Sequence, residues 1–121
     1  SAINAALANE DFSASSGEQQ RDWIYIDDVA EGFRAALDAN LAPGVTFELG
    51  TGWPTSVAAV VQQIYELVNG RGRPLFGALP DRPGEVSFQV AEATRTKTLL
   101  DWRAQITLEE GLQRLLQRLR A

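Results

Sequence analysis

The chain has 121 residues, of which 45% are hydrophobic and 22% are charged, a composition typical of one soluble domain rather than of a disordered or fibrous chain. It contains no cysteine and no histidine, which excludes disulfides, catalytic thiolates, Cys/His zinc sites and Ser-His-Asp triads. Its formal net charge of -5 disfavours nucleic acid as a partner, because an acidic surface repels the phosphate backbone.

Charge is distributed unevenly along the chain. Residues 1–50 carry nine acidic residues against two arginines, whereas residues 71–121 carry nine basic residues against six acidic ones. Lys97 is the only lysine, so contacts to a small anion would be made mainly by guanidinium groups. No apolar run approaches the roughly 20 residues that cross a bilayer, and the first residues do not resemble a signal peptide. We therefore expect a cytoplasmic protein with no membrane partner.

The first forty residues alternate between helix and strand patterns. Residues 1–9 have the apolar spacing of a helix, and residues 12–16 are a candidate strand. Residues 22–26 are rich in aromatic and β-branched side chains, which favours a second strand. A helix should follow, with Asp27 or Asp28 as its N-cap, and reach about residue 40. The side chains expected to face the core from this helix are Val29, Phe33, Ala36 and Leu37.

The middle of the chain predicts a strand, a turn, a long helix and a further strand. Residues 45–49 alternate between apolar and polar side chains, as a strand does. The glycine-containing turn at residues 50–52 leads toward a helix at residues 57–68, whose apolar positions follow the 3.6-residue period and which Gly70 should end. Residues 73–79 are another candidate strand.

The last third predicts a loop and two helices. Residues 81–85 (DRPGE) form a polar loop, and a short helix is expected at residues 94–100. Thr107 and Glu110 form a capping box at the start of a final helix that ends near residue 120. The inner face of that helix is expected to comprise Leu108, Leu112, Leu115, Leu116 and Leu119. The fold class is therefore α+β, with about four helices and three or four short strands.

Three features carry possible chemistry, and each also has a purely structural interpretation. Arg21 begins a strand, where a guanidinium can bind phosphate, but a structural role is favoured from composition alone. The turn at residues 50–52 lacks the third glycine of a dinucleotide loop and the lysine of a P-loop, so an ordinary tight turn is favoured. Arg82 and Glu85 could bind an anion and a sugar hydroxyl, or could simply be a chance ion pair on a solvated loop.

Taken together, five segments resemble the extended short-chain dehydrogenase family, specifically the carboxy-terminal half of its nucleotide-sugar epimerases and dehydratases. They are residues 17–30 (GEQQRDWIYIDDVA), 47–52 (FELGTG), 82–85 (RPGE), 94–102 (TRTKTLLDW) and 107–112 (TLEEGL), and they occur in the family's order. One departure is Glu48, which stands where that family usually has asparagine. The resemblance implies a Rossmann-type enzyme of which this chain forms a partial, carboxy-terminal region.

The resemblance also assigns roles to three residues. Arg21 and Arg82 match the arginines that clamp the substrate pyrophosphate, and Glu85 matches the acid that holds the ribose hydroxyls. The complete enzyme would use NAD or NADP. The chain itself has no G-x-x-G-x-x-G loop, and neither Tyr25 nor Tyr65 is followed by the lysine of a Tyr-x-x-x-Lys pair. We therefore expect no catalytic, cofactor-binding or metal-binding residues here.

The expected organisation is one substrate-binding domain over residues 1–121, without the amino-terminal Rossmann half, inactive alone. Its expected partners are a nucleoside diphosphate sugar and either the missing half or a second copy of the chain, in a homodimer that could be domain-swapped. The alternative is a stand-alone, non-enzymatic binding or interaction module derived from the same fold. The sequence does not name the sugar or distinguish epimerisation from dehydration.

Overall fold

A computed structural model describes residues 1–120 and has five helices and five short strands in that part of the chain. The α+β class is confirmed, with one helix and at least one strand more than expected. In chain order the elements are α1 (Ala2–Leu7), β1 (Phe12–Ser13), β2 (Gln20–Asp22), α2 (Ile26–Asp38), β3 (Pro54–Ser56), α3 (Val57–Val68), β4 (Pro74–Leu75), β5 (Phe88–Gln89), α4 (Ala93–Leu100) and α5 (Leu108–Arg120).

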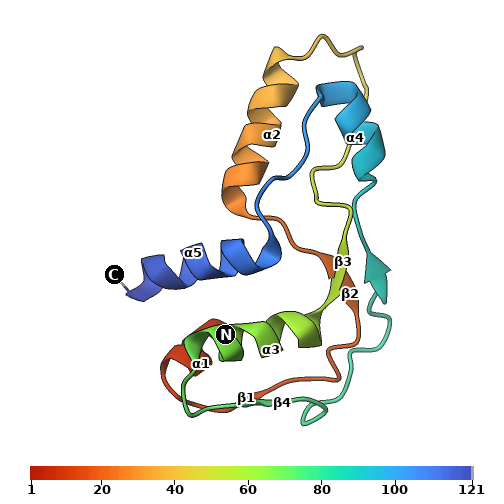
Figure 1. The fold of residues 1–121 in the computed structure, drawn as a ribbon. Helices are drawn as coiled ribbons and strands as arrows, with labels where there is room; N and C mark the ends of the chain where they lie inside the picture. Colours follow the sequence, from red (N-terminus) through yellow and green to blue (C-terminus); the bar gives the residue numbers. More distant parts are fainter. Residues whose placement is uncertain (121) are drawn as a thin grey trace.

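The hydrophobic core lies between α1, α3 and α5, and Figure 1 shows α3 and α5 lying along one another. The buried cluster comprises Ala6, Val60, Val61, Ile64, Tyr65 and Leu112. The α3 helix starts where its apolar period predicts, because the Ser56 hydroxyl accepts a hydrogen bond from the Ala59 N–H at 3.0 Å. It ends at Asn69, which adopts the left-handed conformation with φ 53°, so the predicted stop at Gly70 is one residue late.

The final helix, α5, is also close to its predicted span. The Glu110 N–H donates to the Thr107 hydroxyl at 3.2 Å, which is one half of the expected capping box. The Glu110 carboxylate accepts from Arg114 instead of closing the other half. Leu112 and Leu116 are buried, but Leu119 is 52% exposed. The inner face is therefore shorter than predicted.

Two small sheets connect the helices. The central one has the order β3-β2-β5, with β2 antiparallel to β3 and parallel to β5, and the other pairs β1 with β4. The strand predicted at residues 22–26 has the wrong bounds. The observed strand β2 begins at Gln20 and ends at Asp22, and α2 begins at Ile26. Strand partners, rather than side-chain type, decide which residues pair.

Helix α2 departs most from its prediction. Tyr25 is its N-cap residue and makes no side-chain cap, so neither Asp27 nor Asp28 has that role. Of the stripe expected to be buried, Phe33 is 62% exposed and Leu37 is 86% exposed. Figure 1 shows α2 rising away from α3 with α4 beside it, while its first turn lies against α5, where Asp27 is 3.7 Å from Arg114. The amphipathic pattern is present, but the described part of the chain offers nothing to cover it.

Other predicted strands are shorter or missing. The candidates at residues 12–16 and 73–79 reduce to the two-residue strands β1 and β4. Residues 45–49 form no strand within residues 1–120, although Val45, Phe47 and Leu49 are half-buried and the residues between them are exposed, as the alternation predicts. No helix in the described chain combines the length and the apolar character needed to cross a membrane.

Candidate functional site

The segment at residues 77–86, which carries Arg82 and Glu85, is attached to the connection between β1 and β2. Its first part is fixed by backbone hydrogen bonds, from the Gly77 N–H to the Ser15 carbonyl at 3.0 Å and from the Leu79 N–H to the Ala14 carbonyl at 3.1 Å. Residues 81–89 are all exposed, so burial does little to hold this loop. Polar contacts therefore determine where its side chains lie.

One such contact involves Asp81. Its carboxylate accepts from the Ser16 N–H at 2.9 Å and from the Ser16 hydroxyl at 2.9 and 3.0 Å. These hydrogen bonds, that of the N–H first, lower the pKa of Asp81 below its ordinary value. The carboxylate is consequently ionised at neutral pH and joins the loop to the start of the segment that leads into β2.

The strand pairing brings Arg21 next to this loop. Residue Arg21 of β2 is in register with Gln89 of β5, a strand that directly follows the loop. The Arg21 guanidinium lies 3.6 Å from the Glu85 carboxylate, and the same oxygen accepts from the Gln19 side-chain amide at 2.9 Å. The side chains of Arg21 and Glu85 are 22% and 33% exposed. Gln19, just before β2, and Arg21, within it, thus contact Glu85, which lies just before β5, although the two segments are distant in sequence.

Arg82 and Glu85 both line one cavity. It has a volume of about 310 Å³ and is lined by polar and charged residues. The lining residues are Ser16, Glu18, Gln19, Asp81, Arg82, Glu85 and Ser87. Arg21 is not among them, and it reaches this cavity only through its ion pair with Glu85.

This arrangement can bind a ligand that combines negative charge with hydroxyl groups. Guanidinium groups donate bidentate hydrogen bonds to phosphate oxygens, and a carboxylate accepts from hydroxyls. Sequence reasoning missed Ser16, Gln19 and Asp81, which support these groups. Gln19 lies within the segment that carries the family resemblance, but its partner Glu85 could only be identified from the fold.

Backbone N–H groups in the turn at residues 50–52 donate hydrogen bonds to the carboxylate of Asp22. Asp22 accepts from the Thr51 N–H at 2.9 Å, the Thr51 hydroxyl at 2.6 Å, the Gly52 N–H at 2.9 Å and the Ala91 N–H at 3.2 Å. Burial by itself would raise the pKa of Asp22, but these hydrogen bonds, that of the Thr51 hydroxyl first, lower it on balance. The turn amides are therefore not free to bind a phosphate, in agreement with the structural interpretation.

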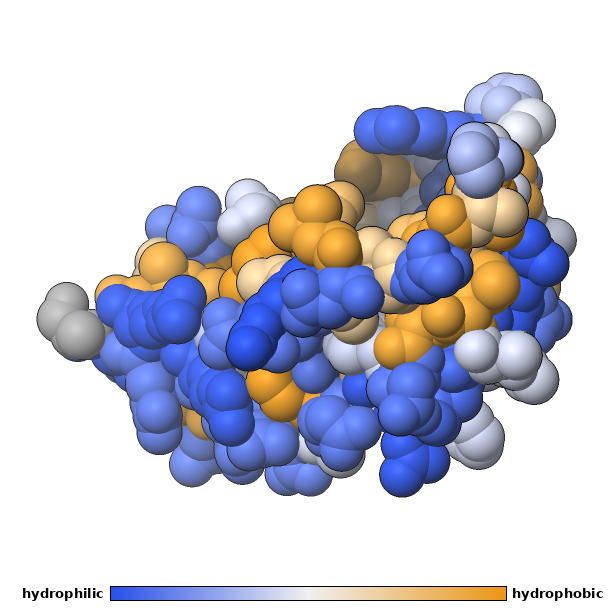
Figure 2. All heavy atoms as spheres, turned by 90° about the horizontal axis from the view of Figure 1, so that it is seen from above, coloured by the Kyte–Doolittle hydropathy of each residue, from blue (hydrophilic) through white to orange (hydrophobic). Residues whose placement is uncertain are grey.

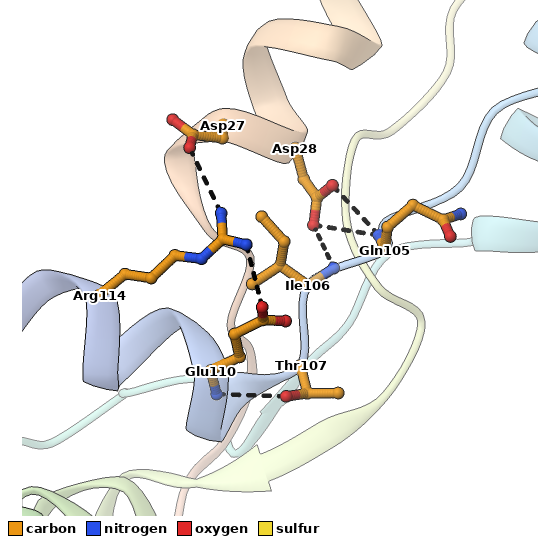
Figure 3. A network of polar contacts seen from close by, with 7 residues as sticks. All are labelled: Asp27, Asp28, Gln105, Ile106, Thr107, Glu110 and Arg114. Atoms are coloured by element: carbon orange, nitrogen blue, oxygen red, sulfur yellow. Dashed lines mark hydrogen bonds and ion pairs between the residues drawn. The ribbon is translucent and has the colours of Figure 1, made fainter.

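Asp28 is also a structural residue, although in another way than predicted. Its buried carboxylate accepts from the N–H groups of Gln105 and Ile106 at 2.9 to 3.1 Å, as Figure 3 shows. Beside it, Arg114 of α5 lies 3.7 Å from Asp27 and 2.9 Å from Glu110. These contacts fix the beginning of α2 against the segment that enters α5.

A larger cavity of about 460 Å³ lies away from the predicted residues. It is lined by Trp23, Trp53 and the segment at residues 104–109, among others. Neither arginine lines it, and two of its polar groups are already bonded within the fold: Trp23 donates to the Thr55 carbonyl and Thr51 to Asp22. The anion-binding candidate is therefore the smaller, polar cavity.

The α+β fold is that of a region of the Rossmann-type enzymes of the extended short-chain dehydrogenase class. Residues 1–115 match the family model described as GDP-mannose 4,6 dehydratase. The chain belongs to this family of nucleotide-sugar epimerases and dehydratases.

Similarity to individual proteins supports this family membership. The chain is 32% identical, over 84% of its length, to a UDP-glucose 4-epimerase of Bifidobacterium longum, of which it covers 29%. The structure of a Thermotoga maritima UDP-glucose 4-epimerase with UDP-glucose aligns with a TM-score of 0.88 at 28% identity, covering 98% of this chain and 38% of that one. The protein MoeE5, in complex with UDP-glucuronic acid and NAD, aligns with a TM-score of 0.80 at 27% identity, over 98% and 39% of the two chains. The chain thus spans about a third of the length of its relatives.

Proposed function

We propose that this chain is the substrate-binding portion of an NAD(P)-dependent nucleotide-sugar epimerase or dehydratase, organised as one domain over residues 1–121. Arg21 and Arg82 hold the diphosphate of a nucleoside diphosphate sugar, and Glu85 accepts hydrogen bonds from the ribose hydroxyls. The observation that carries the proposal is the meeting of Arg21 with Glu85, 3.6 Å apart, at the cavity that Arg82 lines. The family membership and the sugar nucleotides bound by structural relatives support it.

The physical chemistry of the ligand suits this placement. A diphosphate carries negative charges close together, and guanidinium groups can make planar, paired hydrogen bonds to it. Glu85 then faces neutral hydroxyls rather than the anion. Gln19, bonded to Glu85 at 2.9 Å, restricts the direction in which that carboxylate points.

The oxidation chemistry requires residues outside this chain. Neither the glycine-rich loop nor the Tyr-x-x-x-Lys pair is present in its sequence, and the amides of Thr51 and Gly52 are bonded to Asp22. We therefore infer that the residues present do not fit NAD or NADP. In a complete enzyme the cofactor would be bound by the remaining two thirds of the fold.

Titration calorimetry tests the binding function directly. We expect the chain to bind UDP-, dTDP- or CDP-glucose, with UDP alone retaining much of the affinity because the diphosphate and ribose make the main contacts. Free glucose at the same concentration should release no binding heat, since the proposed contacts are to the nucleotide part. If all three sugar nucleotides and their diphosphates fail to bind, the substrate-binding proposal is wrong, and the interaction module becomes the better explanation.

A second surface supports a protein partner. Ile26, Phe33 and Leu37 lie on one face of α2 and are 61%, 62% and 86% exposed. The neighbouring residues 45–49 have the alternation of a strand but no strand partner in the described chain. Figure 2, which views the molecule from above, shows hydrophobic side chains reaching the surface on this side. Exposed apolar area of this kind usually marks an interface.

We propose that the remaining part of the fold covers this surface in a complete enzyme, and that a second copy covers it when the chain is alone. The chain spans only about a third of its relatives' length, so in a complete enzyme the other two thirds would supply the elements that cover α2 and pair with residues 45–49. The same surface is what the alternative, a stand-alone interaction module, would use.

Changing this surface should change the association of the chain. At micromolar concentration we expect a dimer by multi-angle light scattering, and the double variant Phe33→Ser, Leu37→Ser should be monomeric. Leu119→Ser is the matched control, since Leu119 is 52% exposed but lies on α5, and it should remain dimeric. A monomeric wild type would contradict the proposal of self-association.

A further inference from the structure

The contact between Asp81 and Ser16 joins two segments that are far apart in sequence. Both carboxylate oxygens of Asp81 take part, since one accepts from the Ser16 N–H and hydroxyl at 2.9 Å and the other lies 3.0 Å from the hydroxyl. Ser16 is only partly exposed and lies immediately before Gly17, which is buried against Ala58 of α3. The serine end of the contact is therefore anchored to the core.

Arg82 depends on this contact for its position. Between Asp81 and Glu85 the backbone makes one tight turn, with the Glu85 N–H donating to the Arg82 carbonyl at 3.3 Å and Gly84 at φ +76°. Within residues 1–120 the Arg82 side chain makes no hydrogen bond or ion pair of its own. The nearest fixed point on its amino-terminal side is thus the side chain of Asp81.

Asp81 holds the loop without forming an ion pair with Arg82. The carboxylate is directed to the N–H and hydroxyl of Ser16, and no ion pair between Asp81 and Arg82 is formed in the described part of the chain. The hydrogen bonds from Ser16 favour the ionised form of Asp81, since they lower its pKa. The Arg82 guanidinium therefore stays available to an external anion.

We propose that Asp81 and Ser16 are positioning residues that hold Arg82 and the cavity wall in place for the diphosphate of the ligand. This inference rests on the proposed substrate-binding function. Both residues line the same cavity as Arg82 and Glu85, and they act through Arg82 rather than by replacing it.

The first test measures the loop without any ligand. Asp81→Asn and Ser16→Ala should each accelerate amide hydrogen exchange over residues 79–86, and Ser16→Thr, which keeps the hydroxyl and the N–H, should leave it near the wild-type rate. Asp11→Asn is the matched control, because Asp11 also accepts from a backbone N–H, that of Arg73 at 3.1 Å, but lies away from the loop. Unchanged exchange in Asp81→Asn and Ser16→Ala would overturn the inference whatever the chain binds.

The second test measures binding of UDP and of inorganic pyrophosphate by calorimetry. Asp81→Asn should weaken both by about tenfold, the scale of one net hydrogen-bond contribution. In an Arg82→Ala background the same substitution should have almost no further effect, which a merely destabilising change would not reproduce. Wild-type affinity in an Asp81→Asn variant with a loosened loop would overturn the positioning role. A wild-type chain that binds neither ligand would instead refute the proposed function, and the exchange result would still decide whether the contact orders the loop.

Discussion

The double variant Arg21→Ala, Arg82→Ala is expected to lose measurable affinity for a nucleoside diphosphate, and each single variant to lose about tenfold to a hundredfold. A charge-assisted hydrogen bond contributes about 1.5–3 kcal/mol, and each guanidinium removed takes away at least one of them. Arg21→Lys should recover only part of the loss, because an ammonium keeps the charge but not the paired geometry. Calorimetry with UDP measures these differences.

The control for this experiment is Arg34→Ala. Arg34 is exposed on α2, where it lies 3.7 Å from Glu31, and the substitution removes the same charge. It should leave the affinity for UDP unchanged. Equal losses of affinity in Arg34→Ala and Arg21→Ala would mean that net charge, rather than the site around Glu85, governs binding.

Replacing Asp22 is expected to have the largest effect on stability. Its carboxylate joins β2 to the turn at Thr51 and Gly52 and to Ala91, before α4. In Asp22→Ala three backbone N–H groups and one hydroxyl lose their acceptor, and the expected cost is about 3 kcal/mol or more of the free energy of unfolding. A domain of this size has about 5–15 kcal/mol in total, so the variant should unfold at much lower urea concentration.

The effect of Asp22 should depend on pH in a defined direction. Because its folded-state pKa lies below the ordinary value of 3.8, the ionised carboxylate stabilises the fold above that pH and loses this contribution as pH falls through the folded-state pKa. The difference in unfolding free energy between wild type and Asp22→Asn should therefore be largest near neutral pH and shrink in acid. Asp38→Asn, at an exposed position at the end of α2, should show no such trend. A difference that does not change between pH 7 and the acid range would contradict this role of Asp22.

Gly50 offers an independent check on the same junction. A Cβ atom built at Gly50 would lie 2.5 Å from both the Asp22 carboxylate and the Ala91 side chain. The glycine is required there by close packing rather than by its backbone angle. The turn that resembles a phosphate loop is therefore a packing junction, which the sequence pattern alone could not distinguish from a binding loop.

Helices that carry their own burial pattern and caps could be predicted from local sequence. Residues 57–68 became α3 because the 3.6-residue period, the Ser56 cap and the following turn all agree, and Thr107 marks the beginning of α5 for the same reason. The family membership could also be inferred from sequence, because the five segments that carry it lie in a fixed order along the chain.

Strand bounds, long-range hydrogen bonds and burial depend on residues distant in sequence, and these are set only in the folded structure. Only strand pairing places β2 at Gln20–Asp22, and only the fold brings Glu85 to Arg21 and Asp81 to Ser16. The apolar stripe of α2 shows the same dependence, since Phe33 and Leu37 remain exposed where no covering element exists in the described chain. The sequence shows which side chains are apolar or charged. It does not show which distant residues will bury them or form hydrogen bonds with them.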